Sequence, residues 1–147
     1  MYVLGAVVER IRYGDSPVRM TKAQRAEAQL KADLLRSQSY MRSIVQGLIM
    51  YASNNNQTFP PISDWQTALV NGSYIDPDVL SSPVRDGGEY TLIAMPAELD
   101  AEKLVLYEDP NNHASGVNVV FADAHVEQLA HDEFQRLLAE QFSNATP

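Results

Sequence analysis

A run of apolar and small residues from Thr21 to Asn55 constrains the fold of this chain more than any other feature of its sequence. These residues recur at alternating spacings of three and four, which places them on one face of a long α-helix. They are Ala23, Ala26, Leu30, Leu34, Ser37, Met41, Ile44, Leu48 and Tyr51. Such an apolar face has to be covered, either by the chain's own sheet or by a neighbouring molecule.

Charged residues divide this predicted helix into two halves. No charge occurs from Ser43 to Asn56, whereas the first half carries Lys22, Arg25, Glu27, Lys31, Asp33, Arg36 and Arg42. We therefore expect the domain to wrap the second half and the first half to project. Three asparagines at 54–56 should end the helix, because Asn tolerates a left-handed cap and the prolines at 60–61 cannot continue it.

Shorter elements follow the long helix. Ser63–Gln66 has the pattern of a capping box that opens a short helix through Asn71, with Trp65 and Leu69 facing inward. Residues 73–88 contain several turn-forming residues and are expected to form a surface loop. Four segments have the composition of strands, and a closing helix is expected at 132–142. The strands are Glu89–Met95, Leu104–Glu108, Val117–Ala122 and His125–Leu129.

The last two strands are close enough to form a tight hairpin. Val117, Val119 and Phe121 alternate with Asn118, Val120 and Ala122, and Asp123-Ala124 supplies the turn. A two-residue type I′ turn requires positive φ at both central residues, where Ala costs about 1 kcal/mol relative to Gly. The turn is therefore either strained at Ala124 or of another type.

Length and composition indicate one α+β domain. A chain of 147 residues can bury a core without metals or disulfides, and it contains no cysteine. The predicted domain, 21–147, comprises a helix at 21–55, a loop and short helix at 56–88, a sheet of about four antiparallel strands at 89–129 and a helix at 132–142. Residues 1–20 are expected to be a short apolar, turn-like leader, either as it stands or as the remnant of a membrane segment. Its apolar run, Met1–Val8, is far shorter than a membrane span.

The net charge of −8 is distributed unevenly. Residues 1–42 hold eight Lys/Arg against four Asp/Glu, and residues 43–147 hold three against fifteen. The acidic body argues against a nucleic-acid groove, which needs clustered positive charge. An acidic surface suits solubility, Ca²⁺ or a basic partner.

Several motifs occur together in an order that resembles a known family. His113 and Asp123-Ala124 are separated by nine residues, and a helix segment, 41–55, ends in Tyr51-Ala52 followed by asparagines. Phe59-Pro60, Trp65, Tyr74-Ile75 and Leu80–Pro83 follow in the same order. Over residues 37–142 the chain resembles bacterial prepilin-type, type II secretion pseudopilin-like proteins with a C-terminal His-x9-Asp-Gly motif.

The resemblance implies a pilin-like α+β fold and a non-enzymatic structural or assembly subunit. Full members are anchored in the inner membrane and face the periplasm or cell surface. The chain departs from the family in three ways. It shows no membrane segment, Ala124 replaces the motif's glycine, and Ser37 and Ser82 stand where relatives often have cysteines. If those cysteines pair in relatives, this chain has to hold its loop by packing alone.

Four residues are candidates for a metal site, with Zn²⁺ or Ca²⁺ as the ions: Glu108, His113, Asp123 and His125. In the alternative interpretation Asp123 caps the turn, His113 hydrogen-bonds a nearby carboxylate or carbonyl, and His125 is a half-buried strand residue. The stretch 108–112 is rich enough in oxygen ligands for Ca²⁺ but lacks the spacing of a dedicated calcium loop, so a solvated turn is favoured.

These observations favour a subunit that acts by self-association or by contact with other pseudopilin or secretion-apparatus subunits. The predicted interaction face consists of Leu30, Leu34, Met41, Ile44 and Leu48, with the loop at 73–88 as a recognition surface. No nucleophile elbow or phosphate-binding glycine loop is present, so we expect no enzyme. The alternative is a soluble metal- or ligand-binding module with a pilin-like body.

Overall fold

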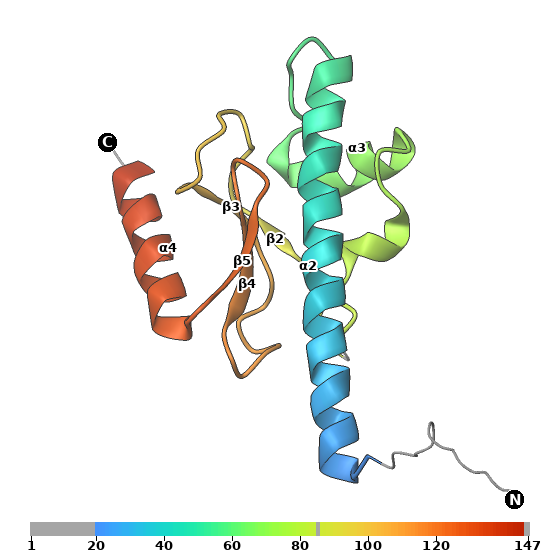
Figure 1. The fold of residues 1–147 in the computed structure, drawn as a ribbon. Helices are drawn as coiled ribbons and strands as arrows, with labels where there is room; N and C mark the ends of the chain where they lie inside the picture. The colour runs from blue at the N-terminus through green and yellow to red at the C-terminus, as the bar shows by residue number, and fades with distance from the viewer. Residues whose placement is uncertain (1–19, 85, 146–147) are drawn as a thin grey trace, which may run out of the picture. The chain divides into compact units, whose positions relative to one another are not determined.

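The computed structural model describes residues 20–84 and 86–145, and it has the α+β architecture expected from the sequence (Figure 1). The chain divides into two compact units after Lys31, and the described residues from Ala32 onward make up the second. The leader at 1–19 lies outside the described residues. Within the described part of the chain no helix combines the length and the apolar character that crossing a membrane requires.

The first described helix, α2, spans Lys22–Asn54, close to its predicted bounds. Its start has a capping box that the sequence analysis missed: Thr21 Oγ1 accepts from the Gln24 amide at 3.0 Å, and Gln24 Oε1 accepts from the Thr21 amide at 2.9 Å. Its end is formed by two left-handed residues, Asn56 (φ 58°) and Gln57 (φ 62°), as the asparagine run predicted. The buried residues run from Ser37 to Ala52, so the domain wraps the second half as predicted and also covers the end of the first half.

The short helix α3, Trp65–Asn71, begins after a 3₁₀ turn at Ile62–Asp64. The predicted capping box is wrong, because Asp64 is the N-cap and makes no side-chain cap hydrogen bond. Trp65 and Leu69 are buried as predicted. Gly72 ends the helix at φ −86°, so its role is steric: a Cβ there would lie 2.4 Å from the Tyr74 ring.

The sheet has four antiparallel strands in the order β2-β3-β4-β5. Their bounds are Thr91–Leu92 for β2, Leu104–Tyr107 for β3, Val117–Phe121 for β4 and Val126–Leu129 for β5. The first strand is much shorter than the predicted 89–95. Between Ser73 and Gly88 the regular structure is a 3₁₀ turn at Pro77–Leu80, with an isolated bridge from Ser81 to Glu89.

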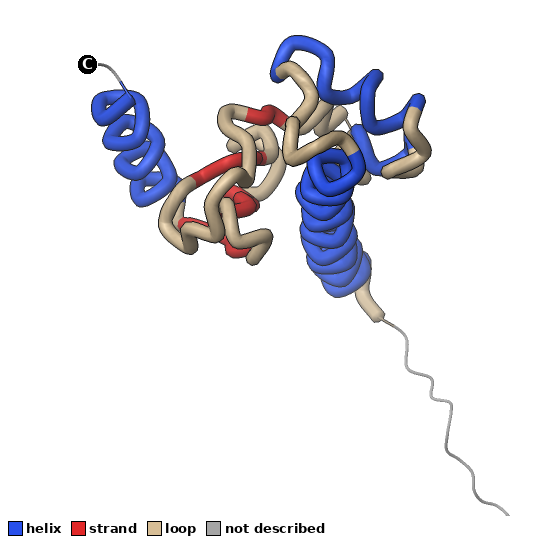
Figure 2. Tube along the Cα trace, turned by 90° about the horizontal axis from the view of Figure 1, so that it is seen from above, coloured by secondary structure: helices blue, strands red, loops and turns tan. Residues whose placement is uncertain are grey.

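Both faces of the sheet are covered, because alternate residues of β4 pack against different helices. Val117, Val119 and Phe121 belong to one core cluster with Phe134 of the C-terminal helix α4, His131–Ala145. Val120 and the following Ala122 belong to a second cluster with the buried face of α2. The strands accordingly lie between α4 and α2 (Figures 1 and 2). Every residue of β4 is therefore buried.

Gln141 fastens α4 to β3 through two hydrogen bonds. Its Oε1 accepts from the Leu104 amide at 2.8 Å, and its Nε2 donates to the Leu104 carbonyl at 2.7 Å. The side-chain amide thus takes the place of a neighbouring strand beyond the end of the short β2. We expect Gln141→Ala to lower the free energy of unfolding by about 1–2 kcal/mol, since both backbone groups lose a partner. Urea unfolding measures this, with the exposed Ala139→Ser as the control; equal midpoints would contradict it.

The turn between β4 and β5 is not the two-residue type I′ turn considered above. Ala122, Asp123 and Ala124 form a three-residue loop in which the Ala124 amide bonds the Phe121 carbonyl at 2.8 Å and the Phe121 amide bonds the His125 carbonyl at 3.0 Å. Ala124 alone in this loop has positive φ, at 74°. The loop type is therefore different, and the unfavourable backbone conformation falls on Ala124.

Replacing Ala124 with glycine should stabilise the domain. Glycine adopts φ of +74° without steric cost, and this gain exceeds its larger loss of conformational entropy. We expect about 0.5–1 kcal/mol, or a rise in Tm of a few degrees. Differential scanning calorimetry tests this. An unchanged or lower Tm would show that the left-handed alanine carries no strain.

Candidate functional site

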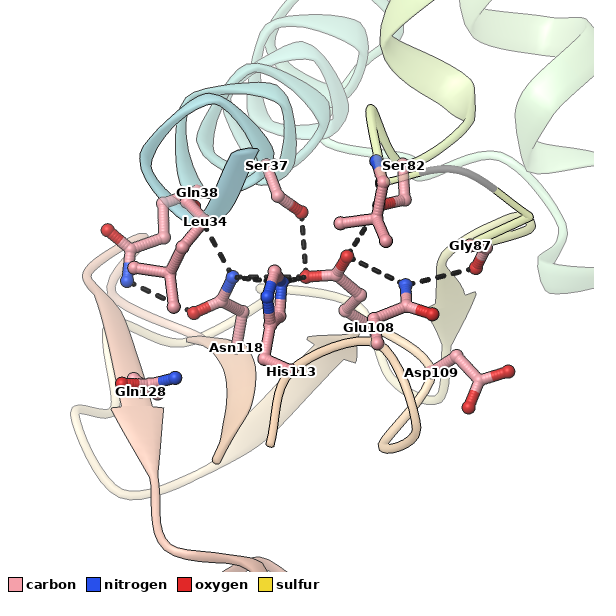
Figure 3. Close-up of polar contacts among 12 residues, drawn as sticks. Leu34, Ser37, Gln38, Ser82, Gly87, Glu108, Asp109, His113, Asn118 and Gln128 are labelled. Carbon is pink, nitrogen blue, oxygen red and sulfur yellow. Dashed lines mark hydrogen bonds and ion pairs between the residues drawn. The ribbon is translucent and has the colours of Figure 1, made fainter. Parts of the chain in front are cut away.

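The most unusual feature of the domain is a buried carboxylate, Glu108, which is 1 % exposed and accepts five side-chain hydrogen bonds (Figure 3). Oε1 accepts from Ser37 at 2.7 Å, from Asn118 at 3.0 Å and from His113 Nε2 at 3.0 Å. Oε2 accepts from Ser82 at 2.5 Å and from Asn112 at 2.8 Å. A buried charge is tolerated only when it is compensated in this way. We call these six residues the Glu108 cluster.

The donors of the Glu108 cluster come from well-separated parts of the chain. Ser37 lies on α2, Ser82 on the loop before β2, and Asn118 on β4. Glu108 directly follows β3, and its amide bonds the Asn118 carbonyl at 3.1 Å, which fixes it beside β4. His113 closes the turn that follows. One carboxylate therefore ties helix, loop and sheet together.

Further hydrogen bonds surround the Glu108 cluster. Ser37 gives its single proton to Glu108, so the Tyr90 hydroxyl, at 2.8 Å, donates to Ser37 Oγ. Asn118 Nδ2 also reaches the Leu34 carbonyl at 3.4 Å, and its Oδ1 accepts from Gln38 at 3.1 Å. Strand β4 is thus bonded directly to α2. This cluster is a network in which each group orients the next.

Glu108 stays ionised despite its burial. Burial alone would raise the pKa of this carboxyl, but hydrogen bonds from Ser82, Asn112 and Ser37, together with nearby His113, hold the pKa below its ordinary value. Burial has the opposite outcome for Tyr90, whose pKa it raises well above the usual range. The cluster consequently contains one anion surrounded by donors.

Ser37 and Ser82 occupy the positions where the resemblance places cysteines, and both bind Glu108, one on each oxygen. The expectation that packing alone holds the loop is therefore wrong. Ser82 Oγ additionally accepts from the Val84 amide at 3.1 Å, and Asn112 Nδ2 bonds the Gly87 carbonyl at 3.1 Å. Hydrogen bonds to and around one carboxylate fix the loop.

A second polar group lies at the hairpin tip. Asp123 Oδ1 accepts from the His125 amide at 3.1 Å and also contacts His125 Nδ1, while His125 Nε2 lies 2.7 Å from Glu127 Oε2. The His125 ring stacks on Phe121 with centroids 4.6 Å apart. Partial burial opposes protonation and lowers the pKa of His125. The hydrogen bonds that its ring donates to Glu127 and Asp123 outweigh this effect and raise the pKa, because both ring nitrogens can donate only in the cation.

The four candidate metal ligands do not converge on one point. Glu108 pairs with His113 at the Asn118 end of β4, and Asp123 pairs with His125 at the hairpin end, five residues or roughly 16 Å further along. Among residues 20–84 and 86–145 no group of three His, Cys, Asp or Glu side chains is placed to hold a metal ion. The contacts of His113, Asp123 and His125 match the alternative interpretation of turn cap, carboxylate partner and half-buried strand residue.

The oxygen-rich stretch after β3 forms a turn that uses its own polar groups. Asp109 Oδ1 accepts from the Asn111 amide at 2.9 Å, and the Asp109 carbonyl accepts from the Asn112 amide at 3.0 Å. Glu108, the strongest candidate ligand in this stretch, is turned into the interior (Figure 3). The favoured solvated turn matches this geometry better than a calcium loop does.

The predicted interaction face on α2 needs correction. Met41, Ile44 and Leu48 are 0 % exposed and lie in the chain's own core, so a partner cannot reach them in the folded domain. Leu34 is half-buried, and Leu30 is 58 % exposed. The helix stripe therefore belongs mainly to the sheet of this chain.

No protein-family model, curated protein or solved structure matches this chain.

Proposed function

We propose that this chain is a non-enzymatic structural subunit of an extracytoplasmic assembly of the pseudopilin type. The sequence resemblance supports this function through the order of its motifs, and the α+β architecture agrees with the resemblance. The observation that carries the proposal is the exposed first part of α2. From Lys22 to Ala32 every residue of the helix is exposed, including Leu30.

A helix of this kind is a ready contact surface for another subunit. Most helical stability in proteins comes from packing of one face, and every residue of this stretch is exposed. It nevertheless continues directly into the buried half of α2, which the core and the Glu108 cluster hold in place. A partner bound to the exposed stretch would therefore be joined to the domain through the same helix.

The Glu108 cluster supports a structural role in the same assembly. Its acid and imidazole groups are buried against one another, and the donors that surround Glu108 come from three parts of the fold. This arrangement serves to fix α2 and the loop on the sheet. Mechanical continuity between helix and sheet is what an assembly subunit requires.

Photo-crosslinking of the full chain in its own cells tests the proposal. A photoreactive residue replaces exposed Leu30 or Leu35, and the adducts are identified by mass spectrometry. Adducts with copies of this chain or with extracytoplasmic filament or secretion subunits are expected. The matched control carries the probe at Gln135, an exposed residue of α4, where fewer such adducts should form. Adducts confined to cytoplasmic enzymes would refute the proposal.

A further inference from the structure

An open groove of about 620 Å³ lies between α4 and the segment that precedes β3. Its apolar lining residues are Phe121, Leu129 and Leu137, with Ala101 beside them. Phe121 and Leu129 are nearly buried parts of the sheet core, so this floor is rigid. The groove is distinct from the Glu108 cluster, none of whose residues lines it.

Carboxylates form the walls of this groove. Asp100 and Glu102 come from the segment before β3, Glu127 from β5, and Glu133 and Glu140 from α4. The positive groups that face them are Lys103 in the lining, His125 against Glu127, and Arg136, which is 3.0 Å from Glu140 and 3.8 Å from Glu133. Even with all three cations counted, two negative charges remain in excess. An apolar floor between acidic walls fits a basic amphipathic segment and repels nucleic acid and anionic lipid.

The chain itself carries a segment of that description. On α2, Ala28, Ala32 and Leu35 are spaced by four and three residues and therefore form one apolar ridge. Arg25 and Arg36 flank the ridge on one side and Lys31 on the other, by the 100° advance per residue of an α-helix. The six residues are exposed, with Leu35 at 59 %. On the Lys31 side Glu27 lies four residues earlier, so the positive charge of the ridge is concentrated on the flank of Arg25 and Arg36. An apolar ridge with this basic flank matches an apolar floor beside acidic walls.

We infer that the groove of one copy binds the ridge Arg25–Arg36 of a second copy, with Leu35 over the apolar floor and the basic side chains against the carboxylates. This inference rests on the proposed assembly function and names its partner surface. Groove and ridge are different surfaces, so the contact is heterologous, and a repeated heterologous contact produces open head-to-tail chains unless its rotation closes a ring. The uneven distribution of charge along the sequence provides the attraction, which salt should weaken.

A charge-swap experiment on the full chain tests this. The groove variant is Glu102→Lys/Glu133→Lys, and the ridge variant is Arg25→Glu/Lys31→Glu. The matched control is Asp64→Lys/Asp78→Lys. It changes the net charge by the same amount as the groove variant, but at two exposed residues that lie outside the groove. Sedimentation velocity over a concentration series at about 50 mM and 500 mM salt gives the association constant, and circular dichroism confirms folding.

We expect the wild-type chain and the control to form concentration-dependent species larger than dimers at low salt. Each charge variant alone should associate at least tenfold more weakly, and an equimolar mixture of the two should recover association. A wild-type chain that stays monomeric at low salt overturns the inference, and so does association that the groove variant leaves unchanged. Association that the groove variant leaves unchanged would refute this docking mode but not the proposed assembly function. The crosslinking experiment judges the proposed function independently.

Discussion

Replacing Glu108 with alanine is expected to lower the free energy of unfolding by about 3–5 kcal/mol, the largest effect of any single polar substitution in the domain. The change removes the acceptor of five hydrogen bonds. Donors on three parts of the fold then lose the acceptor that satisfied them. Alanine also leaves a cavity that the surrounding side chains cannot fill completely. Equilibrium urea unfolding measures the loss, and a change below about 1 kcal/mol would contradict the role assigned to this carboxylate.

Glu108→Gln separates the charge from the shape of the side chain. The amide nitrogen would face either the donors on Oε1 or those on Oε2, and Asn112 cannot turn away because it also bonds Gly87. We expect a loss of about 2 kcal/mol at neutral pH, smaller than for alanine. Asp109→Asn, an exposed change next to Glu108, is the matched control and should be nearly neutral.

The same substitution should change how stability depends on pH. The pKa of Glu108 is lowered by folding, so the unfolded chain binds its proton more readily. The stability that this group contributes is therefore fully present above its unfolded pKa, about 4.3, and is lost as the pH falls through the lower folded pKa. As the pH falls from about 5 through the folded pKa, the wild-type protein should lose more stability than Glu108→Gln. Parallel pH profiles would show that the carboxylate gains nothing from its donors.

The sequence predicted the elements well where a single periodic pattern decided them. The long helix, the β4–β5 hairpin and the closing helix were all located, because burial of one face imposes a regular spacing on the residues. The errors occurred at ends and turns. The capping box at Ser63 did not form, while the one at Thr21 did, since the Thr-x-x-Gln pattern there directly precedes a long helix.

The candidate site was predicted only in part, because its residues are far apart in the sequence. His113 and Glu108 were singled out, but they were interpreted as metal ligands together with Asp123 and His125 of the hairpin tip. Ser37 and Ser82 were connected with the loop only through the family resemblance, and neither Asn118 nor Tyr90 was singled out as a site residue. The available signal was a polar residue on an otherwise apolar stripe: Ser37 on the helix face, and Asn118 within a buried strand. Two polar interruptions on facing elements indicate a buried polar contact between them.

Phe134 is the second residue whose replacement should have a large effect, because it is the fully buried anchor of α4. It is 1 % exposed, lies in a cluster with Leu104, Val119 and Phe121, and makes an edge-on contact with Tyr107 at a centroid distance of 5.0 Å. Leu137 and Leu138 are only partly buried against the same cluster. We expect Phe134→Ala to lower the free energy of unfolding by about 3–5 kcal/mol, through lost burial and a cavity under the helix.

Two measurements distinguish a loss of this anchor from a nonspecific defect. Phe134→Leu keeps most of the apolar volume and loses the ring contact, so its cost should be about 1–2 kcal/mol. Hydrogen exchange should show faster exchange along α4 in Phe134→Ala than in the leucine variant, with the amides of β4 less affected, because the Gln141 bonds alone do not hold the helix on the sheet. Equal costs for the two variants would mean that α4 is held by its remaining contacts. The acidic wall that α4 gives to the groove depends on this anchor, so Phe134→Ala should also weaken head-to-tail association at low salt.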